Sequence, residues 1–323
     1  MVQLDNTDND DDAQTPVKKQ HKKGSLDLLW NLNNAKKSGQ AVEAASRILT
    51  HVSRNPAEVS YTLKRLLRGL ASTSPLTRQN SFVCMAELLR QQGDNLPGPP
   101  EVLAELRETL KVVGGSKSEE GNLLLGQLLA CIALLRSGRL DAAAAALRAQ
   151  VLDLVLANGA KRNYLQFLAV SAVVDYYLEE DAEQVLEKAA KSLPLKLSEA
   201  NLDSLYLILA FFSKKKDCLT EAFCKSTFGV KSLVKKSSLE NLAKGVLGSC
   251  LPYAAVEKHP VIRSVVTVME KLGATAKFWV YVAQEMTGTA HKGLIAMLVL
   301  RYLELIGTGT SFVTPSNQYP DLN

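Results

Sequence analysis

Apolar residues recur along this chain with the spacing of amphipathic helices. One helix is predicted to begin at residues 55–58, N-P-A-E, where Asn55 would be the N-cap, Pro56 the first helical residue and Glu58 the residue three after the cap. The apolar side chains that follow share one face: Val59, Leu63, Leu66, Leu67 and Leu70. The opposite, polar face carries Tyr61, Lys64, Arg65 and Arg68. This segment therefore predicts a helix that packs against a core on one side only.

The same pattern continues through the rest of the chain. A second helix is predicted to start at Ser74-Pro75, and its inward residues are expected to be Phe82, Met85, Ala86 and Leu89. We count about fifteen helical segments from residue 26 to residue 306, so that a pair takes just under the ~40 residues of HEAT or armadillo repeats. No run of alternating β-branched residues interrupts them. We therefore predict an all-α fold, an ARM/HEAT-like α-solenoid of antiparallel helix pairs.

Turn signals place further boundaries. Ser198 is expected to cap the helix that follows Pro194, and Val261 to begin a helix after a loop bracketed by Pro252 and Pro260. Residues 1–23 are an acidic and then a basic block with almost no large apolar residues, and they predict a disordered tail. Residues 24–307 are expected to form the helical-repeat domain, and residues 308–323 a flexible tail at a probable truncation point.

Composition narrows the class of protein. The chain has 323 residues, 46% of them hydrophobic and 6% aromatic, which suits packed Leu- and Ala-rich helices. The dense apolar run from Leu123 to Leu135 is shorter than the ~20 residues of a membrane span. No transmembrane helix and no secretion signal are expected, which indicates the cytosol or the nucleus. The five cysteines have no CxxC spacing and are interpreted as reduced core thiols. The four histidines are far apart, so no metal site and no cofactor are predicted.

Three short patterns suggest chemistry, and each has a simpler explanation. Residues 114–118, G-G-S-K-S, lack the Gly directly before Lys and the preceding strand of a phosphate-binding loop, and they are interpreted as a helix end followed by a new N-cap. Two LxxLL motifs, at residues 63–67 and 125–129, continue into longer apolar faces and are interpreted as core. One group of acidic residues is the only candidate for the two-metal site of a polymerase or nuclease: Asp175, Glu179, Glu180, Asp181 and Glu183. These acids lie near helix ends, where solvated carboxylates are common, so the chain is not expected to be an enzyme.

Charge gives the main candidate site. Residues 214–244 contain eight lysines and three acidic residues, a net charge of +5, which equals that of the whole chain. Such a basic surface is typical of proteins that bind nucleic acid or acidic partners. The residues proposed for this surface are Lys214, Lys215, Lys216, Lys231, Lys235 and Lys236. Phe223 and Phe228 have the spacing of a core face, so stacking on single-stranded bases is not predicted. A second basic group is a candidate nuclear-import signal: Lys18, Lys19, Lys22 and Lys23.

The sequence resembles the Myb-binding protein 1A / DNA polymerase V (polymerase phi) family. Residues 61–72, Y-T-L-K-R-L-L-R-G-L-A-S, are similar to the family's Y-x-L-K-R-L-x-R-G-L-x-S segment, which marks Lys64, Arg65 and Arg68 as a motif surface. Residues 126–140 are similar to its G-x-L-F…L-x-x-S-G-x-L segment. Looser matches occur at residues 26–30, at His259-Pro260 and in the segment 278–302.

What the resemblance implies is a nucleolar helical-repeat scaffold and transcription coregulator that acts in rRNA gene transcription and ribosome biogenesis. Its expected partners are transcription factors or ribosome-biogenesis proteins, together with rDNA or rRNA. Neither binding to a membrane nor a small-molecule substrate is expected. Two alternatives stay open at this point: a cytosolic or transport HEAT/armadillo adaptor, and a true DNA polymerase, as the family name suggests.

Overall fold

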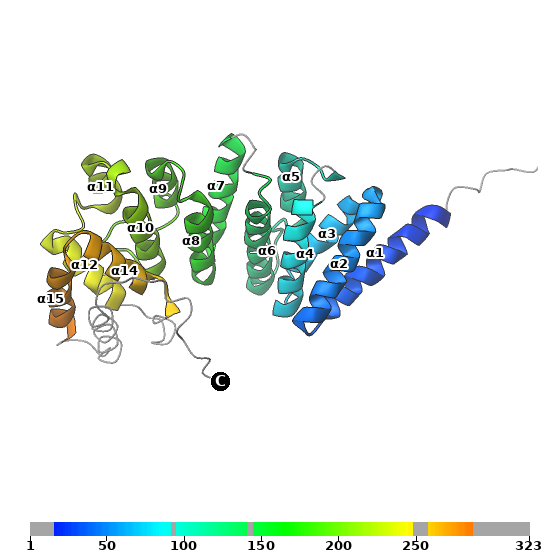
Figure 1. The fold of residues 1–323 in the computed structure, drawn as a ribbon, viewed down its shortest axis with the longest axis horizontal. Helices are drawn as coiled ribbons and strands as arrows, with labels where there is room; N and C mark the ends of the chain where they lie inside the picture. Colours follow the sequence, from blue (N-terminus) through cyan, green and yellow to red (C-terminus); the bar gives the residue numbers. More distant parts are fainter. Residues whose placement is uncertain (1–15, 92–94, 141–144, 248–257, 287–323) are drawn as a thin grey trace, which may run out of the picture. The chain divides into compact units, whose positions relative to one another are not determined.

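The computed structural model describes residues 16–91, 95–140, 145–247 and 258–286 (Figure 1). Within these ranges the chain forms fourteen α-helices and two short 3₁₀ helices, and it contains no strand. The predicted all-α class is confirmed. The chain divides into two compact units, Met1–Leu165 and Gln166–Asn323, whereas the sequence predicted one helical domain over residues 24–307.

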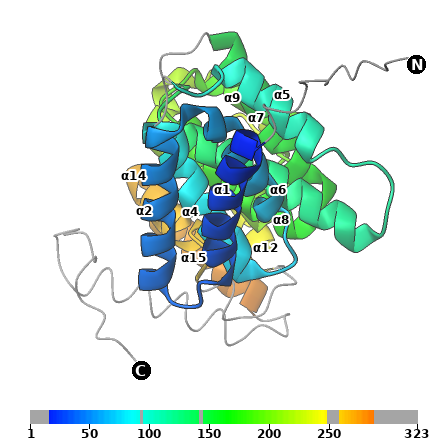
Figure 2. The same ribbon diagram turned by 90° about the vertical axis from the view of Figure 1, so that its right-hand side faces the viewer.

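Unit 1 contains seven complete α-helices and one 3₁₀ helix. They are α1 (Pro16–Asn34), α2 (Ser38–Arg54), η1 (Pro56–Glu58), α3 (Val59–Leu70), α4 (Pro75–Gln91), α5 (Pro99–Thr109), α6 (Lys117–Arg136) and α7 (Ala145–Lys161). α1 and α2 lie side by side and both contact α4 (Figure 2). α1 begins eight residues before the predicted start of the helical domain at residue 24, so part of the expected N-terminal tail is helical.

The boundary between the units falls within α8 (Asn163–Tyr177). Unit 2 continues with α9 (Ala182–Ala190), α10 (Leu202–Lys215), η3 (Lys216–Cys218), α11 (Glu221–Phe228), α12 (Lys236–Leu247), α14 (Val261–Lys271) and α15 (Thr275–Met286). Within it, α10 packs against α14, α12 against α15, and α11 against α9.

α3 and α4 form the predicted antiparallel pair, and their contact explains a glycine of the family-like segment. The side chains of Leu63, Leu66 and Leu67 are at most 1% exposed, so the first LxxLL motif is core, as predicted. A β-carbon at Gly69 would lie 2.2 Å from the hydroxyl oxygen of Ser81 on α4. Atoms cannot approach this closely without a shift, so glycine permits the close packing of the two helices. In the second motif, Leu128 is buried, whereas Leu125 and Leu129 are partly exposed.

Two predicted side-chain caps are wrong, because one candidate bonds back to the preceding helix and, at the other helix start, a neighbouring residue makes the cap. Asn55 does not cap α3: its side-chain amide donates to the carbonyl of His51 at the end of α2, and η1 precedes α3. Ser198 does not cap α10, because the side-chain oxygen of Asn201 accepts the N–H of Ser204 instead. The prediction for Ser74 is confirmed, since its hydroxyl oxygen accepts the N–H of Thr77 at the start of α4.

Buried amide side chains connect the helices of unit 1. Asn80 on α4 donates to the carbonyls of Leu32 and Ala35 at the end of α1, at 3.0 and 3.1 Å. Gln127 on α6 donates to the carbonyl of Leu110 at 2.8 Å and accepts from Asn158 on α7 at 3.0 Å. Carbonyls in the last turn of a helix lack the usual partner within the helix, and these amides supply hydrogen bonds to them inside the core.

α6 is the one helix among the described residues that is long and apolar enough to cross a membrane by length and composition alone. This differs from the expectation drawn from the shorter run of residues 123–135. Half of its most apolar window is buried, and the helix contacts α3, α4, α5 and α7. Its buried Gln127 belongs to the amide contacts of the core. These contacts are those of a central core helix.

The described cysteines fit the core interpretation with one exception. Cys84 and Cys131 are fully buried, and burial raises the pKa of each thiol to about 12. Cys224 is also buried, and its pKa is raised mainly by desolvation. Cys218 is exposed, so the core prediction is wrong for this residue. Cys250 lies outside the described residues.

Candidate nucleic-acid interface

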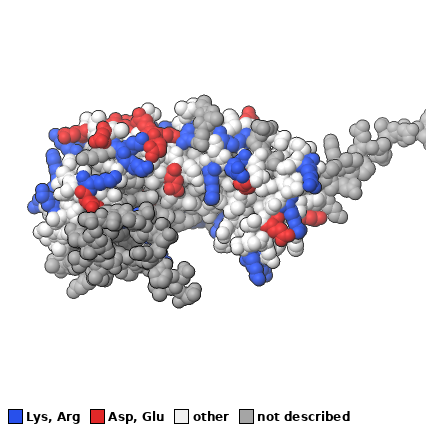
Figure 3. Space-filling model, viewed as in Figure 1, with Lys and Arg blue, Asp and Glu red and all other residues white. Residues whose placement is uncertain are grey.

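The predicted lysine region extends over several elements of unit 2. Lys214 and Lys215 end α10, Lys231 and Lys235 lie in the turn between α11 and α12, and Lys236 is the first residue of α12. The backbone of Lys216 lies in η3, but its side chain is outside the described part of the structure. In Figure 3, atoms of basic residues lie along the edge that carries α11 and α12, with acidic atoms among them.

Lys214 and Lys215 are both held by one carboxylate. Glu179, in the turn between α8 and α9, forms ion pairs with Lys214 at 3.2 Å and with Lys215 at 3.5 Å. Lys215 also donates to the backbone carbonyl of Glu179. The hydrogen bond from Lys214 and the charges of both lysines lower the pKa of the Glu179 carboxyl. Part of the positive charge of the predicted surface is therefore balanced within the unit.

The other lysines of the predicted site lie at a folded turn. The hydroxyl of Ser238 on α12 donates to the carbonyl of Ser232 at 2.7 Å, which holds the turn against the start of the helix. Lys231 and Lys235 are exposed, and neither has an ion-pair partner among the described residues. Lys236 is 3.8 Å from Glu240. Two of these three lysines thus keep an uncompensated charge.

The structure adds two lysines that the sequence argument did not propose. The N–H of Leu197 donates to the carbonyl of Phe228 at 3.0 Å, which brings the exposed Lys196 to the end of α11. Lys225 is exposed on the last turn of α11. Neither has an ion-pair partner within the described ranges. Lys225 lies within the basic stretch of residues 214–244 and could have been included in the predicted site. No sequence signal connects Lys196 with Phe228, about thirty positions later.

The aromatic residues of this region are core residues, as predicted. Phe223 and Phe228 are 6% and 0% exposed, and their rings meet edge to face. These two rings are therefore not available for stacking on bases.

The family-like motif surface on α3 also lies where the sequence placed it. Lys64, Arg65 and Arg68 are exposed. Lys64 pairs with Glu105 on α5 at 3.1 Å. Partial burial opposes ionisation of Glu105, but hydrogen bonds from Thr109 and Lys64 and the charges of Lys64 and Arg68 lower its pKa overall. This face is partly neutralised by α5.

The glycine-rich segment before α6 is not arranged to hold a phosphate. Ser116 is the N-cap of α6, and its hydroxyl accepts the N–H of Glu119 at 3.2 Å. In return the carboxylate of Glu119 accepts the N–H of Ser116 at 2.8 Å. A carboxylate of the chain therefore already occupies this helix start, and the predicted N-cap is confirmed.

The candidate metal-binding acids have other contacts. Asp181 caps α9 by accepting the N–H of Gln184, and Glu183 accepts hydrogen bonds from the N–H and hydroxyl of Thr220. Glu179 holds the two lysines described above. Among the described residues, no group of three or more His, Cys, Asp or Glu side chains could hold a metal ion.

His259 is buried and forms a pair with Asp203, but both of its ring nitrogens are in use. Nε2 is 3.0 Å from the Asp203 carboxylate, and Nδ1 accepts the N–H of Val261 at the start of α14 at 3.1 Å. The Phe167 ring lies 4.9 Å from the imidazole, centre to centre. The pair fixes α14 against α10, and no nitrogen is left to take a proton from a substrate.

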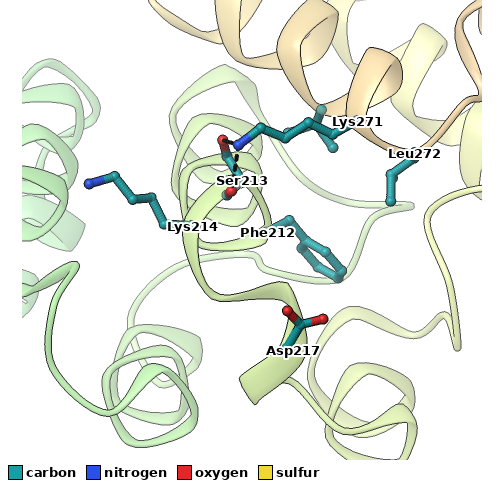
Figure 4. Close-up of a pocket in the computed structure, with 7 residues that line it drawn as sticks. Phe212, Ser213, Lys214, Asp217, Lys271 and Leu272 are labelled. Carbon is teal, nitrogen blue, oxygen red and sulfur yellow. Dashed lines mark hydrogen bonds between the residues drawn. The ribbon is translucent and has the colours of Figure 1, made fainter.

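A small hollow lies at the ends of α10 and α14 (Figure 4). Its volume is about 190 Å³, and Ser213, Lys214, Asp217 and Lys271 supply its polar groups. The ammonium group of Lys271 donates to the carbonyl and the hydroxyl of Ser213 at 2.9 and 3.2 Å. In Figure 4, Lys214 points away from Lys271. The lysines therefore do not converge on a ligand here.

The candidate import residues Lys18, Lys19, Lys22 and Lys23 fall on the first turns of α1, and their side chains are outside the described part of the structure.

Comparison with known proteins agrees with these features of sequence and fold. No solved structure matches the chain. Over 199 residues the chain is 25% identical to a mouse (Mus musculus) protein named Myb-binding protein 1A. The match covers 61% of this chain and 14% of the length of that relative. The model of the DNA polymerase phi family matches residues 61–259, from the start of the Y-x-L-K-R motif to His259. The chain therefore belongs to the DNA polymerase phi family.

Proposed function

We propose that this protein is a nucleolar helical-repeat scaffold and transcription coregulator that acts in rRNA gene transcription and ribosome biogenesis. Membership of the DNA polymerase phi family carries the proposal, and the name of the mouse relative, a Myb-binding protein, supports transcription factors as partners. Ribosome-biogenesis proteins and rDNA or rRNA are the other proposed partners.

The proposed scaffold is an ARM/HEAT-like α-solenoid of antiparallel helix pairs. The α3–α4 pair and the succession of helices without strands in the described ranges support this arrangement. Repeats of this kind present extended surfaces on which partners bind without a catalytic pocket.

We propose binding rather than catalysis. A polymerase needs carboxylates that converge on two metal ions. Three of the five acids that the sequence suggested for that role have other contacts: Asp181 caps a helix, Glu179 holds lysines and Glu183 accepts hydrogen bonds from Thr220. Primer extension with the purified chain and Mg²⁺ tests this point directly, and template-dependent extension would overturn it.

The localisation and the partners are tested in cells. The tagged chain should concentrate in nucleoli, and its capture followed by mass spectrometry should enrich transcription factors or ribosome-biogenesis proteins. A uniform cytosolic distribution with transport factors as partners would favour the alternative of a cytosolic HEAT/armadillo adaptor. The matched control is the chain with Leu66→Ala and Leu242→Ala, which should lose capture because each change opens a cavity in a fully buried core.

A further inference from the structure

We propose that four lysines of unit 2, namely Lys196, Lys225, Lys231 and Lys235, form a surface that binds the phosphate backbone of duplex nucleic acid without sequence preference. The proposal rests on the proposed nuclear function, and it assigns the partner class and the residues of this surface, named here the α11–α12 lysine surface.

The backbone brings these lysines together. The N–H of Leu197 bonds to the carbonyl of Phe228, the last residue of α11. Lys196 directly precedes Leu197, so its backbone lies next to the end of this helix. Lys225 and Lys231 are each three residues from Phe228, on either side of Gly229, whose φ of +73° ends the helix. Three residues span at most about 10 Å of extended chain, so the backbones of these lysines are close neighbours.

The turn before α12 joins Lys235 to the same place. The hydrogen bond from Ser238 to Ser232 holds residues 232–235 against the helix start, and Lys231 directly precedes Ser232. All four lysines are exposed, and none has an ion-pair partner in the described part of the chain. The nearby acids along the chain are Glu199, Glu221 and Glu240, and Glu240 already faces Lys236. The surface therefore keeps a net positive charge.

The type of cation favours contacts that do not depend on base sequence. No arginine occurs between Arg162 and Arg263, so every cation of this surface is a lysine. The guanidinium group of arginine can form two parallel hydrogen bonds with a carboxylate, a phosphate or a guanine edge, whereas lysine is a flexible point charge. Lysine contacts of this kind position a duplex but do not read its bases.

The charge density of duplex DNA and the burial of the nearby phenylalanine rings both favour a duplex as the ligand. Duplex DNA carries one charge per about 1.7 Å of its axis, and binding gains from the release of its condensed counterions. An extended acidic peptide has at most one charge per about 3.3 Å. Phe223 and Phe228 are buried, so their rings cannot stack on unpaired bases, and a duplex is favoured over a single strand.

The test compares two lysine pairs from the same basic stretch of sequence. Lys231 and Lys235 have no ion-pair partner among the described residues, whereas Lys214 and Lys215 pair with Glu179. The full chain and its variants are titrated with a labelled duplex of mixed sequence at 50 to 200 mM salt, followed by fluorescence anisotropy. The double change Lys231→Gln and Lys235→Gln should reduce the slope of log affinity against log salt by about 1.8, because two phosphate contacts are lost. The matched change Lys214→Gln and Lys215→Gln should reduce the slope by at most about 0.9, because Glu179 pairs with both lysines and balances one of their two charges.

The fourfold change of all four lysines to Gln extends the test. If four phosphates are contacted, the parent should lose about a hundredfold in affinity between 50 and 200 mM salt, and the fourfold variant should lose almost none. Circular dichroism and thermal midpoints should match the parent, because exposed lysines contribute little to stability.

Three outcomes would overturn the inference. They are absence of binding at 50 mM salt, equal effects of the two pairs, and displacement of the duplex by a polyglutamate peptide at the same concentration of charge. Loss of nucleolar localisation in a chain that keeps salt-dependent binding would instead count against the proposed function alone.

Discussion

The two units of this protein differ in their content of arginine and in how their cations are paired. Residues 1–165 contain eleven arginines, and residues 166–323 contain only two. In unit 1, guanidinium groups bond to groups of the same unit: Arg78 to the carbonyl of Ser72, and Arg162 to the carboxylate of Glu120 at 2.8 Å. In unit 2, several lysines have no partner among the described residues.

This difference shows why a count of charges does not locate a binding surface. Exposed ion pairs contribute little to stability, but each pair removes a charge from what a partner can contact. Unit 1 has many cations, and a good part of them is committed to its own carbonyls and carboxylates. In unit 2 the same test separates Lys214 and Lys215 from Lys231 and Lys235, although all four lie within one basic stretch of sequence.

The first prediction tests the hydrophobic cores of the two units, which should respond alike to the loss of a buried leucine. Leu66→Ala in α3 and Leu242→Ala in α12 each remove a leucine that is at most 1% exposed. Each change should lower the free energy of unfolding by about 2 to 5 kcal/mol, because it leaves a cavity. Urea unfolding followed by circular dichroism measures this loss. The exposed Lys64→Ala is the control and should stay within about 0.5 kcal/mol. Similar large losses at Leu66 and Lys64 would contradict the orientation of α3.

The second prediction contrasts a histidine from each unit. His259→Ala in unit 2 removes two hydrogen-bonding contacts and leaves Asp203 and the N–H of Val261 without that partner. It should cost about 1 to 3 kcal/mol, the usual cost of an unpaired buried polar group. His51→Ala in unit 1 should cost less, because Nε2 of His51 is buried with no hydrogen-bond partner. Thermal and urea unfolding of both variants give the comparison, and an equal or larger loss at His51 would contradict it.

The third and smallest effect on stability concerns the carboxylate that holds two lysines. Glu179→Gln should change the free energy of unfolding by less than about 1 kcal/mol, because the pair is exposed. It should nevertheless steepen the salt dependence of duplex binding by up to about 0.9, because the lost carboxylate balanced one of the two lysine charges.

The same carboxylate gives a pH dependence. The pKa of Glu179 is held below its ordinary value of 4.5, so the two ion pairs persist above that value and are lost only as the pH falls through the lower, folded pKa. Duplex binding by the parent should therefore show no release of these lysines between pH 7 and pH 5. A rise in affinity over that range that is absent from Glu179→Gln would contradict the assignment.

The fold class could be predicted from the sequence because helical periodicity is a local property. The buried face of α3 and the start of α4 follow from the spacing of Leu63, Leu66, Leu67 and Leu70 and from Ser74-Pro75. The two wrong caps have a different cause. Asn55 and Ser198 are suitable cap residues by type, but Asn201 competes for one helix start and the end of α2 takes the amide of Asn55.

The candidate site could be predicted only in part. A run of lysines is visible in the sequence, but the carboxylate of Glu179 that pairs with two of them lies about 35 residues away along the chain. Lys196 joins the surface through a single backbone hydrogen bond between segments that no periodicity connects. Both effects arise from tertiary contacts, which a sequence window does not contain.

The hydrogen bond between Leu197 and Phe228 links ligand binding to folding. Lys196 and Lys231 are neighbours only in the native state, so a duplex that needs both binds the folded chain and not the unfolded one. A ligand of that kind raises the free energy of unfolding by mass action, by about 2.7 kcal/mol at a concentration one hundred times its Kd. The melting temperature of the protein should therefore rise as more of it is bound to duplex. A substitution that unfolds α11 should abolish binding even though all four lysines are still present.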